Sequence, residues 1–169
     1  MATTYEAIAT VTVGSGGAAN IEFTSIPATY TNLVLKLSLR SNRAATFDNT
    51  QIEINSSTAN MTSRLLTGNG STASSGNTTT FYVGDIPAAS ATSNTFANQE
   101  VYLPNYAGSS NKSASSDSVA ENNATAGFNQ LAANLWSQTA AITSLKMYSG
   151  NTENFVEYST ATLYGIKNS

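Results

Sequence analysis

The stretch SIPATYTNLVLKLSLRS, residues 25–41, decides the class of fold. Four leucines occupy alternate positions in it: Leu33, Leu35, Leu37 and Leu39. Other residues fill the gaps between them: Val34, Lys36, Ser38 and Arg40. Because side chains alternate between the two faces of a β-strand, this spacing predicts a strand with its leucines in the core. The sequence pattern does not say whether the opposite face of this strand contacts water, a ligand or another copy of the chain.

The rest of the chain repeats the pattern of short strand and turn. Turn-rich segments such as GSGG and GNGSTASSGN, residues 14–17 and 68–77, separate the apolar runs. Leu131, Ala133 and Leu135 alternate in FNQLAANLW, which favours a strand over the helix that its composition also allows. We predict one domain over residues 1–169, an all-β antiparallel sandwich, jelly-roll-like, with about 8–11 strands. Strands are expected at 6–13, 19–23, 33–40, 49–55, 62–67, 78–86, 94–103, 113–122, 128–136, 141–150 and 155–167.

The composition excludes several classes of function. The chain contains no cysteine and no histidine, which removes disulfides, Cys-ligated zinc and the usual nucleophile–base pairs. Only 10% of the residues are charged, the net charge is −3, and the seven Lys and Arg residues are scattered. A phosphate backbone therefore has no basic stripe to bind, and nucleic acid is not an expected partner. The first residues, MATTYEAIATVTV, have no basic segment and no long apolar run, so we expect neither a signal peptide nor a membrane span.

Catalytic motifs are weak throughout the chain. SSNK, residues 109–112, matches S-x-x-K but lies in a Gly/Ser loop without a helix to set its geometry. Paired carboxylates could hydrolyse glycosides without histidine. Four glutamates, however, fall inside predicted strands on the outward face, where solvated charges normally lie: Glu22, Glu53, Glu100 and Glu157. Asp48 in FDNT lacks the regular ligand spacing of a calcium loop and is typical of an Asx turn. We expect no enzyme activity, no metal and no cofactor.

The aromatic residues are more informative. Four of them suit the core of a sandwich: Phe23, Phe81, Trp136 and Phe155. The tyrosines are harder to place, because a tyrosine on a strand face can stack on a sugar or anchor a protein interface. Half of them are explained by packing at the edge of the core.

Several phrases spread along the chain resemble small structural proteins of tailed bacteriophages, those of marine phages and cyanophages above all. They are the opening MATTYEAIATVTVGSG, then IEFTSIPATYTNLVLKL and TSRLLTGNGS, and the ending YSTATLYGIK. The resemblance implies an oligomeric β-sandwich protein of the virion without enzymatic role, assembled in the host cytoplasm and released by lysis. It carries over no catalytic residue.

Two functions follow as expectations. The first is a capsid decoration, or cement, protein that binds the outer head surface as a homotrimer, with itself and the major capsid protein as partners. The second is a tail, neck or fibre module that binds host-surface glycans. In either case we expect the contacts to involve basic residues near the leucine strand and several tyrosines: Lys36, Arg40, Arg43, Tyr102, Tyr106, Tyr148 and Tyr158.

Overall fold

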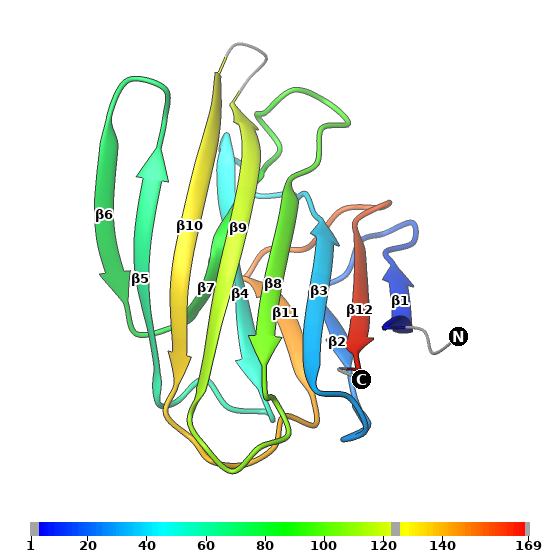
Figure 1. Ribbon diagram of the computed structural model, residues 1–169. Coiled ribbons are helices and arrows are strands. Elements are labelled where there is room, and N and C mark those ends of the chain that lie inside the picture. The colour runs from blue at the N-terminus through cyan, green and yellow to red at the C-terminus, as the bar shows by residue number, and fades with distance from the viewer. Residues whose placement is uncertain (1–3, 123–125, 168–169) are drawn as a thin grey trace.

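The computed structural model describes residues 4–122 and 126–167 and is built from strands alone (Figure 1). Two antiparallel sheets contain the twelve strands of these residues. The large sheet has the order β1 (Tyr5–Thr12), β12 (Thr160–Ile166), β3 (Asn32–Ser38), β8 (Asn98–Pro104), β9 (Lys112–Asn122), β10 (Ala126–Trp136), β5 (Met61–Gly68) and β6 (Ala73–Thr78). The small sheet has the order β2 (Asn20–Phe23), β11 (Leu145–Ser149), β4 (Phe47–Ile54) and β7 (Phe81–Pro87). The predicted sandwich is confirmed.

The strand order is that of a jelly roll with two inserted hairpins. When β5–β6 and β9–β10 are set aside and the other eight strands are numbered along the chain, the sheets read 1-8-3-6 and 2-7-4-5. This order defines an eight-stranded jelly roll. Both hairpins extend the large sheet beyond β8, with β9–β10 next to β8 and β5–β6 next to β10 (Figure 1). The molecule is therefore a jelly roll with a four-stranded extension made of β9, β10, β5 and β6.

The leucine strand lies at the centre of the core, as predicted. Its four leucines are at most 3% exposed and face the small sheet. The four aromatic residues predicted for the core, Phe23, Phe81, Trp136 and Phe155, are buried as well. Glu22, Glu53 and Glu100 lie on the outward faces of strands, as predicted, and Glu53 and Glu100 form ion pairs with lysines of neighbouring strands. Glu157 is exposed but lies in a turn before β12, so its placement in a strand was wrong.

Strand β7 lies at one edge of the small sheet and packs on the inner face of the extension. Hydrogen bonds from the side chains of the large sheet satisfy its backbone. The amide of Tyr82 donates to Asn134 Oδ1 at 3.1 Å, and the amide of Asp85 donates to Gln130 Oε1 at 2.6 Å. Ser118 Oγ donates to the carbonyl of Asp85 at 3.4 Å. The inner face of the extension is thus polar where it meets the edge of another sheet, since buried backbone groups need partners.

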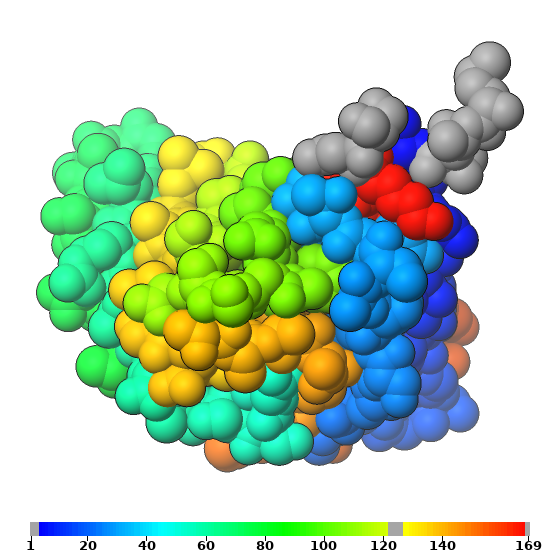
Figure 2. Space-filling model, turned by 60° about the horizontal axis from the view of Figure 1, so that its bottom comes forward, coloured from blue at the N-terminus to red at the C-terminus, as the bar shows by residue number. Residues whose placement is uncertain are grey.

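Loops close one end of the sandwich (Figure 2). Two side chains secure them from inside. Tyr106 is fully buried and donates its hydroxyl to the carbonyl of Pro27. Lys112 is 2% exposed and donates from Nζ to the carbonyls of Gly108 at 2.6 Å and Thr139 at 3.4 Å. The lysine of SSNK therefore holds a loop in place.

Two details differ from the sequence expectations. Residues 73–77, predicted to be part of a loop, belong to strand β6, because the Asn69–Thr72 turn folds the chain back onto β5. The alternation in FNQLAANLW does mark a strand, but Leu131 and Leu135 face solvent while Gln130, Ala132 and Asn134 face β7. Within the described residues, no helix has the length and hydropathy needed to span a membrane.

Candidate functional site

The outer face of the extension carries the largest group of exposed apolar side chains that the structure describes. Leu66 on β5 is 60% exposed, and its cross-strand neighbour Leu131 on β10 is 49% exposed. Leu135 and Val119 add to the same face. A shallow groove of about 590 Å³ runs over this face from β6 to β9, and Leu66, Leu131, Ala133 and Ser115 are among the residues that line it. We call these five apolar residues, Leu66, Val119, Leu131, Ala133 and Leu135, the apolar face.

Charged residues border the apolar face on both sides. Arg64 lies opposite Ala133 on β5, and Asp117 lies opposite Leu131 on β9. Both side chains are exposed, and neither has an ion-pair partner within residues 4–122 and 126–167. An apolar centre with a polar rim is the usual composition of a protein interface. The apolar face is therefore the candidate contact site of the molecule.

On the rest of the outer face of the large sheet, over β1, β12, β3 and β8, the side chains contact one another. Val34 lies between Tyr102 and Tyr164 in register and is only 2% exposed. The ring of Tyr164 contacts Tyr5, with 5.4 Å between centroids. Lys36 is exposed and pairs with Glu100 on β8. The outward side of the leucine strand is thus covered by tyrosines and an ion pair of its own chain.

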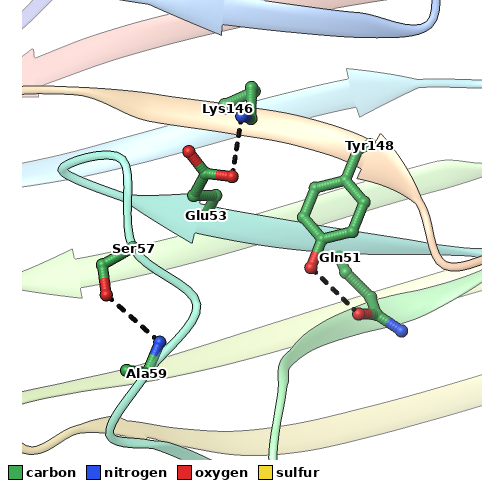
Figure 3. Close-up of polar contacts among 6 residues, drawn as sticks. All are labelled: Gln51, Glu53, Ser57, Ala59, Lys146 and Tyr148. Carbon is green, nitrogen blue, oxygen red and sulfur yellow. Dashed lines mark hydrogen bonds and ion pairs between the residues drawn. The ribbon is translucent and has the colours of Figure 1, made fainter.

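The small sheet carries a second hollow on its outer face, of about 340 Å³, and Glu53, Lys146 and Tyr148 are among the residues that line it. Figure 3 shows the polar contacts of these side chains. Tyr148 on β11 donates its hydroxyl to Gln51 Oε1 on β4 at 3.2 Å. Beside it, Lys146 Nζ lies 2.7 Å from Glu53 Oε2. Burial raises the pKa of Tyr148, and the charge of Glu53 raises it further. A ring, an amide and an ion pair lie together here, and such groups can contact a sugar.

The seven predicted contact residues do not converge. Lys36 and Tyr102 lie on the outer face of the large sheet, Tyr148 on that of the small sheet, and Tyr158 in a loop, where it is 68% exposed. Arg43 is half-buried and donates to the carbonyl of Phe47 at 2.7 Å. The structure thus divides the predicted set among separate regions.

Two of the seven residues lie inside the molecule, which corrects the expectation that they contact a partner. Tyr106 is completely buried. Arg40 is 8% exposed, and its guanidinium donates to the carbonyls of Thr92 at 2.7 Å, Thr95 at 3.1 Å and Ala91 at 3.2 Å. Burial lowers the pKa of Arg40, and Glu121 partly opposes this effect. The guanidinium thus holds the loop between β7 and β8 instead of pairing with acid groups of another subunit.

A buried titratable cluster lies between β7 and the extension. Tyr82 donates its hydroxyl to Asp85 Oδ1 at 2.6 Å, and Gln130 Nε2 donates to Asp85 Oδ2 at 3.0 Å. Burial raises the pKa of Asp85, while these two hydrogen bonds lower it in part. Burial also raises the pKa of Tyr82. The cluster belongs to the polar contact under β7, and in the described part of the chain no three metal-ligating side chains gather at one point.

Sequence reasoning missed the apolar face, although two signals for it were present. In RLLT, Leu65 and Leu66 are adjacent, so a strand must turn one of them outward. In ANLW, Leu135 precedes the core residue Trp136 and must therefore face the other side. Comparison of the chain with protein-family models, curated proteins and solved structures finds no match.

Proposed function

We propose that this chain is a non-enzymatic structural protein of a tailed bacteriophage, a decoration protein that binds the outer head surface and stabilises it. The observation that carries the proposal is the apolar face, with Leu66 and Leu131 at its centre. Burying apolar area contributes about 25 cal/mol per Å², so exposed leucines on a rigid sheet favour a protein contact. The sequence resemblance to phage structural proteins supplies the setting.

The contact is expected to join copies of the chain, as a homotrimer, to the major capsid protein. Each copy brings a modest apolar area, and linked copies gain affinity by multivalency. The jelly roll agrees with this role by analogy, because viral capsid and lectin domains use the same fold. The virion is then the site of action, reached by assembly in the host cytoplasm and lysis.

The first experiment measures the copy number of the chain in purified phage particles by quantitative peptide mass spectrometry. Decoration of the head predicts hundreds of copies, on the order expected when many subunits bind a repeated lattice. A few copies per particle would contradict head decoration and place the chain in the tail or fibres. Its absence from the particle would contradict the whole proposal.

A double variant, Leu66→Ser with Leu131→Ser, tests the face itself. Both side chains are half-exposed or more, so the domain is expected to fold, while occupancy on the particle falls at least about tenfold. Glu22→Ser is the control, because Glu22 is also exposed but lies on β2, at the edge of the other sheet. Equal occupancy of the double variant and the control would show that the apolar face is not the contact.

The second candidate is a glycan-binding module of the tail, neck or fibres. The hollow beside Tyr148 favours it, since the phenol ring, the Gln51 amide and the Glu53–Lys146 pair lie on one accessible face (Figure 3). A glycan array probed with the native protein and with Tyr148→Ala tests it. Binding that disappears in the variant supports this candidate, and no binding by the native protein removes it.

A further inference from the structure

The two sheets of the molecule have four edges, and three of them are protected against pairing with another chain. Strand β1 has a register shift between Ala7 and Ala9, and Glu6 near its start lies 3.7 Å from Lys167 Nζ. Strand β2 is only four residues long and carries the exposed Glu22. Strand β7 is bonded by side chains of the extension. Bulges, short length, charges and covering groups are the ordinary devices that keep a sheet edge from adding strands.

The fourth edge, β6, has none of these devices. Its sequence ASSGNT contains no charge and no proline, and it pairs with β5 without a register shift. The side chains of Ala73 to Asn77 are exposed. The hairpin β5–β6 forms one margin of the molecule in both views, and no described strand lies beyond it (Figures 1 and 2). The free edge of β6 is therefore open to strand addition.

The turn that begins β6 determines which backbone groups point outward. The amide of Asn69 donates to the carbonyl of Thr72 at 3.2 Å, so these two residues form a hydrogen-bonded pair. Such pairs alternate with non-bonded pairs along an antiparallel ladder. In the register of β5 and β6, this alternation turns the N–H and C=O groups of Ala73, Ser75 and Asn77 away from β5.

We propose that β6 pairs in antiparallel fashion with β6 of a second copy of this chain, about a two-fold axis at Ser75. Ser75 then lies opposite Ser75 of the partner subunit, and Ala73 lies opposite Asn77 of the partner subunit. All three outward residues bond through both their N–H and C=O groups. A second copy suits this edge because the strand is preformed in each copy, and because two uncharged strands of small side chains neither repel nor clash.

The pairing would join two eight-stranded sheets into one continuous sheet. A two-fold axis perpendicular to the sheet places both apolar faces on the same side, where they form one longer surface. This two-fold contact is separate from the contacts within the proposed homotrimer and would join copies of neighbouring trimers. The inference deepens the proposed assembly role and rests on the proposed function for that setting. The contact itself is a property of the isolated protein and is tested there.

The test uses the full chain carrying Ser75→Pro. Proline removes an N–H that β5 does not use, so the hairpin is retained while the added strand loses a central hydrogen bond. Ser15→Pro is the matched control, because Ser15 is exposed in the turn at 14–17, at a position that favours proline. In sedimentation equilibrium we expect the native protein and Ser15→Pro to associate through the two-fold contact with the same dissociation constant. For Ser75→Pro we expect this dissociation constant to rise at least about tenfold.

Hydrogen exchange gives a second measurement that does not depend on a variant. The amides of Ala73, Ser75 and Asn77 should become protected as protein concentration rises, whereas those of Ser74 and Gly76 should be protected at every concentration. Association of Ser75→Pro equal to that of the control, or fast exchange of the three outward amides at all concentrations, would overturn the inference. If the contact holds but the chain is absent from phage particles, the proposed function fails and the edge pairing stands.

Discussion

Arg40 was expected to contact a partner, but its side chain stabilises a loop of its own chain. It follows the leucine strand, and its alternation with the leucines predicts an outward, exposed side chain. The strand ends at Ser38, however, and the guanidinium of Arg40 donates to carbonyls of the loop between β7 and β8. The period-two pattern predicts orientation only within a strand, which is why Arg40 could not be placed from the sequence.

Replacing this residue tests its role. Arg40→Met removes the guanidinium donor from the carbonyls of Ala91, Thr92 and Thr95, although the Thr92 carbonyl still accepts from the Thr95 hydroxyl. We expect a loss of about 3 kcal/mol in the free energy of unfolding. Arg43→Met, which removes one carbonyl contact from a half-buried residue, is expected to lose about 1 kcal/mol or less. Urea unfolding measures both. A loss for Arg40→Met no larger than that for Arg43→Met would refute this role.

Asp85 offers a test of pH dependence at the same scale. Its pKa in the folded state is raised by burial above the value of about 3.9 in an unfolded chain. The folded state therefore holds the proton more tightly, so ionised Asp85 lowers stability above its folded pKa, and this effect vanishes below pH of about 4. Asp85→Asn keeps the acceptor for Tyr82 but loses the one for Gln130 Nε2, a loss that does not depend on pH. Relative to the native protein, the melting temperature of the variant should therefore be higher at pH 7 than near pH 3. The exposed Asp117→Asn, the control, should change neither, and equal effects of Asp85→Asn at both pH values would contradict the argument.

At the scale of the element, β7 is the strand whose backbone lies in close contact with the extension. A Cβ on Gly84 would lie 2.2 Å from both Cβ and Oγ of Ser118, so β7 approaches the extension as closely as its backbone allows. We expect Gly84→Ala to lower the free energy of unfolding by about 3 kcal/mol. Gly14→Ala is the control, since a methyl group added there would have no atom within 4 Å and the substitution should be nearly neutral.

A double variant makes this prediction specific. Adding Ser118→Gly to Gly84→Ala removes both clashing atoms, and part of the lost stability should return. Calorimetry of the two single variants and the double variant gives the coupling. Simple additivity of the two losses would show that the close approach of β7 is not the cause.

The predictability of the elements followed the strength of their apolar pattern. Strands β3 and β4 alternate clearly, and the sequence located both within about two residues. Strand β6 has only small polar residues, so nothing in its composition separates it from a turn, and its pairing with β5 is a tertiary effect. The faces of β10 were ambiguous for the same reason, because its inner face is polar where it meets β7. The candidate contact surface was missed together with them, since it is the outer side of these strands.

At the scale of the whole molecule, the jelly roll depends on β12. This strand lies between β1 and β3 and pairs with both along its length. A chain that ends at Ser159 would therefore expose the edges of both neighbours and the apolar side chains of Leu35 and Leu37. We expect this truncated chain to show no cooperative unfolding transition.

Adding a peptide of residues 160–167 to the truncated chain should restore the transition, because the peptide can supply both ladders. A peptide with Leu163→Asp is the control and should fail, since Leu163 is fully buried. Circular dichroism during urea titration measures both. A truncated chain that unfolds cooperatively without the peptide would contradict the dependence on β12.

The central place of β12 also affects how the protein is made. About 120 residues separate β3 from β12, and ribosomes add roughly 5–20 residues per second. After β3 is made, on the order of ten seconds therefore pass before β12 is available to pair with it. Throughout this interval the slot beside β3 stays vacant and can accept a strand from a neighbouring polysome. High expression would raise the local concentration of such nascent chains and increase this hazard. Its yield would then depend on the spacing of ribosomes along the messenger as well as on the stability of the finished fold.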